Sequence, residues 1–151
     1  MSKPIDTPTL SIALEEGARK LENRSAHEVT KTLTGLVVHF VKTAGFEAKT
    51  EFATGLFKNK RVRVDVAALR DGEPVAFFEI DRTHKGISQD KLLGGLQKGI
   101  QAIWVRWGDP AGLPGSRRHT AHVYDGVETV TLPINYRRSL RGAVVCPGVA
   151  A

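Results

Sequence analysis

The sequence has only one cysteine, Cys146, among its 151 residues. A single cysteine cannot form an internal disulfide or a cysteine-rich zinc site, and this usage is typical of proteins in a reducing compartment. No hydrophobic run approaches the roughly 20 residues that a membrane-spanning helix needs. The opening segment MSKPIDTPTL lacks the apolar stretch of a signal peptide. We therefore expect a cytoplasmic protein without membrane association.

Several familiar catalytic motifs are missing as well. The sequence contains no Walker-type phosphate loop, serine elbow or dinucleotide fingerprint, and the Gly94-Gly95 pair lacks the strand-turn-helix setting that such motifs need. Four histidines have no companion acids or cysteines at ligand spacing, namely His27, His39, His119 and His122. The sequence therefore gives no reason to propose a zinc site or a nucleotide-dependent motor.

Basic residues are abundant instead. Lysine and arginine outnumber aspartate and glutamate 22 to 16, and the formal charge is +6. This balance is common among proteins that bind polyanions. A hydrophobic content of 41% with 25% charged residues is ordinary for a folded chain of this length. We predict one domain over residues 11–140, with flexible tails at 1–10 and 141–151.

Two helices are predicted in the first third of the chain. Apolar residues recur at helical spacing from Ile12 to about Asn23. Ser25 and Glu28 fit a capping box, in which each side chain bonds the backbone amide of the other residue. The helix that follows carries an apolar stripe from Val29 to Ala44 and ends at Gly45.

The rest of the sequence alternates strands, turns and one further helix. Strands are predicted at 46–53, 62–66, 74–80 and 102–107, with a basic loop at 54–60 and a helix at 88–98 in which Gly94 and Gly95 indicate close backbone contact. Asp71-Gly72 is a hairpin turn, and Asp125-Gly126 predicts a final hairpin of 120–125 with 128–132. This order favours an α/β fold with a mixed central β-sheet flanked by helices.

Acidic residues interrupt two of these strands. Val62, Val64 and Val66 are expected on one face of their strand, which leaves Asp65 on the other with Arg61 and Arg63. With a three-residue hairpin loop at 71–73, Asp65 faces Glu79 across the hairpin, whereas a two-residue loop would stagger the pair. Two facing carboxylates need a proton or a cation between them, and Mg²⁺ prefers such an oxygen-rich site.

An Asp on one strand, a hairpin, and a Glu on the next strand resemble the PD-(D/E)xK nuclease superfamily over about residues 28–107. The resemblance implies a restriction-endonuclease-like core and phosphodiester hydrolysis with Mg²⁺ or Mn²⁺. It assigns the metal to Asp65 and Glu79, with the carbonyl of Ile80 as an extra ligand. It also places Glu28 beside the site, as the acidic residue that many members carry on the first core helix.

The motif departs from the family at one position, because Asp81 stands where a lysine is expected. The segment Glu79-Ile-Asp-Arg-Thr-His84 resembles relatives of very-short-patch repair endonucleases. On that comparison Asp81 is a further metal ligand, and His84 is a general base or a ligand. Lys85 or Lys91 could instead replace the missing lysine from the following helix. Loss of catalysis is a further alternative.

Basic residues surround the acids. Those expected to contact nucleic-acid phosphates are Lys58, Lys60, Arg61, Arg63 and Arg82, and a second cluster comprises Arg117, Arg118, Arg137, Arg138 and Arg141. The expected partner is nucleic acid, most simply DNA, and the chain could form a homodimer.

Plainer interpretations stand beside these. The acids could be exposed charges neutralised by neighbouring arginines, Glu28 could serve only as a cap, and Trp104 and Trp107 are expected to pack in or beside the core. The leading hypothesis is a metal-dependent nuclease acting on DNA. Its alternatives are a catalytically inactive nuclease-like module that binds nucleic acid or a protein, and a small RNA-binding protein.

Overall fold

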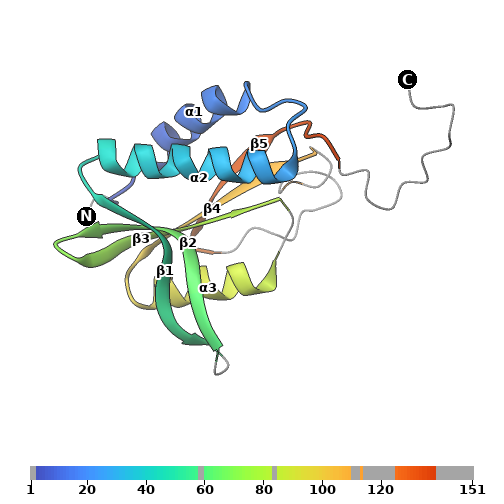
Figure 1. Cartoon of the computed structure of the whole chain (residues 1–151). Helices are drawn as coiled ribbons and strands as arrows, with labels where there is room; N and C mark the ends of the chain where they lie inside the picture. Colours follow the sequence, from blue (N-terminus) through green and yellow to red (C-terminus); the bar gives the residue numbers. More distant parts are fainter. Residues whose placement is uncertain (1–2, 58–59, 83–84, 110–112, 114–124, 139–151) are drawn as a thin grey trace, which may run out of the picture.

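The computed structural model describes residues 3–57, 60–82, 85–109, 113 and 125–138. Its elements are α1 (Thr7–Ala18), α2 (Ala26–Thr43), β1 (Glu47–Phe57), β2 (Lys60–Arg70), β3 (Glu73–Asp81), α3 (Gly86–Gln97), β4 (Gln101–Gly108) and β5 (Val127–Pro133). The strands form one sheet in the order β1-β2-β3-β4-β5, with α1 and α2 over one face and α3 over the other (Figure 1). The predicted α/β class, a mixed sheet flanked by helices, is confirmed. Within the described ranges no helix has the length and apolar character needed to cross a membrane.

The first helix begins earlier than the sequence pattern predicted. A flexible tail was expected over residues 1–10, but α1 starts at Thr7, with a proline in its first turn, where the missing amide costs nothing. Ile5 is 1% exposed, and its backbone N–H and carbonyl both bond the side chain of Gln101, each at 2.9 Å. The predicted apolar face is confirmed at Leu14, Ala18 and Leu21, which are buried, and wrong at Ile12, which is 61% exposed.

The second helix follows its predicted pattern closely. The N–H of Glu28 donates to Oγ of Ser25 at 3.2 Å, as a capping box requires. The carboxylate of Glu28, however, accepts from the Ser25 hydroxyl at 3.1 Å, where the prediction had the Ser25 amide. The buried stripe of α2 comprises Val29, Leu33, Val37 and Val41. This stripe packs α2 onto the sheet with Phe78 and Ile80 of β3 in the same core cluster.

The sheet combines an antiparallel meander with parallel strands. β1, β2 and β3 pair antiparallel, α3 makes the crossover from β3, and β3, β4 and β5 pair parallel. Residues 54–57 were expected in a loop but belong to β1. Trp104 and Trp107 are buried, as predicted. The first strand of the expected final hairpin, 120–124, lies outside the described residues, whereas β5 pairs with β4.

The β2–β3 hairpin has the predicted register at Asp65 and Glu79, but its turn is shorter than predicted and a bulge makes up the difference. Its turn holds two residues, Asp71 and Gly72, both with positive φ, and not the expected three. A bulge then shifts the register between Ala68 and Leu69, so that Val66 pairs with Phe78. The bulge therefore restores the register in which Asp65 lies opposite Glu79.

Beyond this register the β1–β2 ribbon twists away from the sheet. Pairing of β2 with β3 begins at Val66, so the part of β2 before it pairs with β1 alone (Figure 1). Val64 packs in the cluster on the α3 side, whereas Val66 packs in the cluster under α1 and α2. The expectation that these valines share one face is therefore wrong. The twist falls at Asp65, where the backbone pairing of β2 with β3 stops.

Candidate active site

Asp65 and Glu79 meet where β2 separates from β3. The N–H of Asp65 donates to Oε2 of Glu79 at 3.0 Å, and the N–H of Ile80 donates to Oδ2 of Asp65 at 2.8 Å. Side-chain oxygens thus replace the backbone acceptors that a continued ladder would have supplied. The structure brings this predicted pair together at the point where β2 and β3 stop pairing.

A lysine from α3 completes the cluster. Nζ of Lys91 lies 2.5 Å from Oε1 of Glu79 and donates to the carbonyl oxygen of Arg63 at 2.7 Å. Lys91 is one turn before Gly95, and an added Cβ at Gly95 would come within 2.7 Å of the Phe77 ring. The close contact predicted at Gly94 and Gly95 is therefore present at Gly95 only, since an added Cβ at Gly94 would meet nothing within 4 Å. The contact at Gly95 holds the Lys91 face of α3 against the sheet.

The environment of Glu79 favours its neutral form. Burial and the adjacent Asp65 charge raise the pKa of Glu79 from 4.5 to about 8, against the opposing effect of the Lys91 ammonium. The side chain is only 1% exposed, which agrees with burial as the largest cause. At neutral pH the carboxyl group of Glu79 therefore carries a proton.

The donor set fits a hard divalent cation. Burial, together with the neighbouring Asp65 charge, keeps a proton on Glu79, and a cation could take the place of that proton. The N–H and carbonyl of one strand residue point to the same side, so the carbonyl of Ile80 faces β2 as its amide does. Within the described ranges no group of three or more His, Cys, Asp or Glu side chains could hold a metal. Mg²⁺ needs only one or two carboxylates because it keeps several waters.

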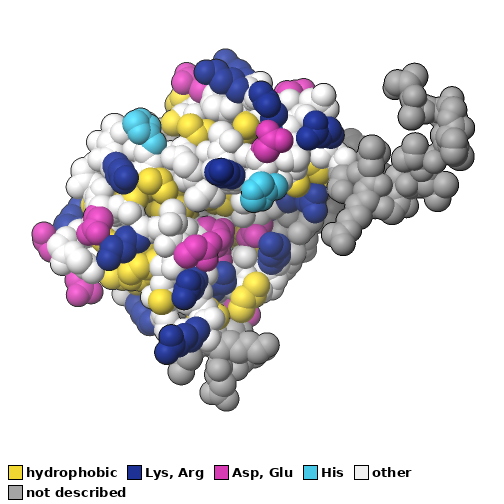
Figure 2. Space-filling model, in the orientation of Figure 1, with side chains coloured by type: hydrophobic (Ala, Val, Ile, Leu, Met, Phe, Trp, Pro, Cys, Tyr) yellow, Lys and Arg dark blue, Asp and Glu magenta, His cyan; other side chains and the backbone are white. Residues whose placement is uncertain are grey.

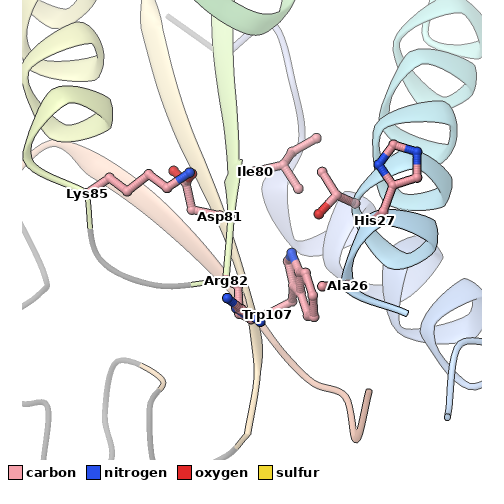
Figure 3. Close-up of a pocket in the computed structure, with 8 residues that line it drawn as sticks. Ala26, His27, Ile80, Asp81, Arg82, Lys85 and Trp107 are labelled. Carbon is pink, nitrogen blue, oxygen red and sulfur yellow. The ribbon is translucent and has the colours of Figure 1, made fainter. Parts of the chain in front are cut away.

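Asp81 lies apart from this pair. Its Oδ2 accepts from Nε1 of Trp104 at 2.9 Å, and Nζ of Lys85 lies 3.4 Å from its Oδ1. Of the two lysines proposed to replace the motif lysine, Lys91 contacts Glu79 and Lys85 contacts Asp81. Asp81 also lines a cavity of about 290 Å³ between α2 and the end of β3 (Figure 3).

Sequence reasoning missed His27 as a neighbour of this cavity. His27 and Thr30, in the first turns of α2, line the same cavity as Asp81. The only signal was that His27 precedes Glu28, the residue that was predicted to face the site. Glu28 itself pairs with Arg24 at 3.7 Å and with Arg137 at 3.8 Å.

Some of the basic residues predicted to bind phosphates lie in the part of the chain that the structure describes. Arg61 and Arg63 are exposed on the ribbon, and Arg82 is exposed after β3. Figure 2 shows acidic side chains gathered between α2 and the β1–β2 hairpin, with lysine and arginine side chains on several sides of them. Predicted residues outside the described part are Lys58, His84, Arg117, Arg118 and Arg141, together with the side chain of Lys60.

Comparison of the chain with protein-family models, with curated proteins and with solved structures finds no match.

Proposed function

We propose that this protein is a metal-dependent nuclease that hydrolyses phosphodiester bonds of DNA, with a restriction-endonuclease-like core. The observation that carries the proposal is the Asp65–Glu79 pair on adjoining strands, with Lys91 beside it. The order helix, meander, crossover helix and parallel strand is the order in which the resembled superfamily would place these acids. Exposed Arg61 and Arg63 on the adjacent ribbon suit contacts with phosphates.

Each residue of the cluster has a role in this proposal. Asp65 and Glu79 would hold Mg²⁺ or Mn²⁺, with the Ile80 carbonyl as a further ligand. A bound ion of this kind activates water and stabilises charge on the scissile phosphate. Lys91 orients the Glu79 carboxylate and supplies the ammonium that the motif normally carries at the position of Asp81. Asp81, bonded to Trp104, is then a cavity residue and not a ligand of the same ion.

Cleavage of plasmid and of single-stranded DNA in the presence of Mg²⁺ or Mn²⁺ tests the proposal. We expect cleavage by the wild type and none by Asp65→Ala or Glu79→Gln. Glu73→Gln is the matched control, because Glu73 is exposed at the opposite end of the same strand. The absence of cleavage with every metal, or equal cleavage by Asp65→Ala, would contradict the proposal.

The second candidate is a nuclease-like module that has lost catalysis and binds nucleic acid or a protein. The burial of Glu79 and its raised pKa favour it, because a cation must displace a proton from a nearly inaccessible carboxyl group. Calorimetric titration with Mg²⁺ and Mn²⁺ separates the two candidates. A nuclease should bind the ion through Asp65 and Glu79, whereas the inactive module should give no heat that depends on these residues.

A further inference from the structure

The cavity beside Asp81 opens at the carboxyl ends of the parallel strands β3 and β4. Its walls are apolar where Ala26, Ile80 and Trp107 line it, and Asp81 contributes a buried carboxylate. His27, Arg82 and Lys85 add basic groups to the lining, and all three are exposed to solvent. Figure 3 shows Asp81 and Lys85 on one side of β3 and Ile80 and His27 on the other, with Arg82 and Trp107 near the end of the strand. Apolar walls with a few polar groups are typical of a pocket for a small polar ligand.

A second cavity of about 780 Å³ continues from the first, since Ala26, His27 and Arg82 line both. Arg137 and Arg138 line it too, with side chains 64% and 72% exposed. This second cavity is therefore strongly basic, although Glu28 and Asp109 each pair with one of its arginines.

Tyr136 organises the arginines of the second cavity. The guanidinium of Arg82 lies 5.0 Å from the centre of the Tyr136 ring, and that of Arg138 lies 5.7 Å from it. The ring itself packs edge-on against Trp107 at 5.3 Å between centroids. Guanidinium groups stacked on an aromatic ring present flat, positively charged surfaces, which bind both phosphates and unstacked bases.

We propose that the smaller cavity receives one unpaired nucleotide of the substrate strand, and that Arg82 and Arg137 bind phosphates of the same strand. This inference rests on the proposed nuclease function and names the form of its substrate. The smaller cavity is just below the usual size range of ligand pockets, roughly 300–1,000 Å³. A single base out of its stack can enter such a space, whereas a stacked base pair cannot.

The position of this cavity suits a strand that also reaches the acids. Glu79 and Asp81 are two residues apart on β3, a separation of about 7 Å along an extended strand. The amide of Ile80 bonds Asp65, while its side chain lines the cavity. Two residues that line the cavity, Ile80 and Asp81, therefore lie within two residues of Glu79 along β3, and Asp81 offers an acceptor for amino groups on a base edge.

Fluorescence anisotropy in EDTA, with a labelled single-stranded oligonucleotide and with its blunt duplex, tests this inference without cleavage. We expect the wild type to bind the single strand more tightly than the duplex. Combined Arg82→Gln and Arg137→Gln substitutions should reduce the slope of log affinity against log salt by about 0.7 for each lost contact. Lys42→Gln is the matched control, because Lys42 is exposed near the far end of α2.

A variant that fills the cavity tests the nucleotide site itself. Thr30→Phe should weaken single-strand binding at least tenfold, while Thr32→Phe, on an exposed face of the same helix, should not. Circular dichroism of both variants checks the fold. Equal affinity for single strand and duplex, or unchanged binding by Thr30→Phe, would overturn the inference even if the protein cleaves DNA. Binding that depends on the cavity without cleavage under any metal would instead reject only the nuclease activity.

Discussion

The carboxyl groups of Asp65 and Glu79 each accept a hydrogen bond from a backbone amide of the opposite strand, at or next to the other acid. The amide of Asp65 donates to the Glu79 carboxyl group, and the amide that follows Glu79 donates to the Asp65 carboxyl group. The two strands are thus joined by side chains at the point where their backbone pairing stops. Because each carboxyl group accepts a backbone amide, neither can turn away without leaving a buried donor unpaired.

The first prediction concerns the charge of Asp65. Asp65→Asn keeps an oxygen for the Ile80 amide but removes the charge that repels Glu79 and would attract a cation. We expect divalent-ion binding and cleavage to be lost, while the melting temperature at pH 8 is unchanged or higher. Calorimetric titration and thermal unfolding measure the two effects. If the Asp65→Asn variant bound Mg²⁺ like the wild type, the Asp65 carboxylate would not be a ligand of the metal.

The second prediction concerns Lys91. Lys91→Met removes a charge-assisted contact to Glu79, and we expect it to lower the free energy of unfolding by about 1.5–3 kcal/mol. The loss should not exceed this range, because Glu79 is already neutral at pH 7 and removal of Lys91 leaves no buried negative charge on it. Lys98→Met serves as the control, since Lys98 is exposed after the same helix, and its effect should stay within about 0.5 kcal/mol. Equal effects in urea unfolding would show that the Lys91 contact adds no stability.

The third prediction follows from the raised pKa of Glu79. Between its unfolded value of 4.5 and its folded value of about 8, the folded protein binds more protons than the unfolded chain. Stability should therefore fall as pH rises through this window and level off above it, with a slope of at most about 1.4 kcal/mol per pH unit. Urea unfolding of the wild type and of Glu79→Gln across the window measures the effect. The Glu79→Gln curve should lack this decline, and identical curves would contradict the assignment.

The fourth prediction uses two adjacent glycines of α3. An added Cβ at Gly95 would meet the Phe77 ring, which is 4% exposed, so Gly95→Ala should cost about 1–3 kcal/mol. At Gly94 an added Cβ meets nothing within 4 Å, so Gly94→Ala should stabilise the helix by about 0.5–1 kcal/mol. Thermal unfolding of the two variants should therefore shift in opposite directions. Shifts of the same sign would contradict the packing described for Gly95.

The sequence was informative where a short-range rule sufficed. Strand alternation and the hairpin turn together predicted that Asp65 faces Glu79. The turn length was wrong, but the bulge between Ala68 and Leu69 compensated for the error. Pro74 pairs with Leu69 at this bulge, and a proline inside a strand is typical of such a position, so the sequence held a signal that was not used. The stripe of α2 was predictable for a similar reason, since its spacing alone fixes which side chains are buried.

Features that depend on packing between distant segments were not predictable. The choice of Lys91 over Lys85 as the partner of Glu79 depends on the rotation of α3, which the contact of Gly95 with Phe77 sets. The fixed position of the backbone at Ile5 depends on a hydrogen bond to the side chain of Gln101, a residue in β4. His27 borders the cavity beside Asp81 only because the first turn of α2 packs next to the end of β3.

The compensating bulge has a consequence for how this chain can tolerate change. One residue inserted into the turn at Asp71-Gly72 lengthens the loop to three residues, a length that by itself supports the observed register without a bulge. A deletion in the turn would shift the register by a further residue. The existing bulge cannot correct this shift, because it already compensates for one residue. Insertions in this hairpin should therefore spare the acidic pair, whereas deletions should separate it.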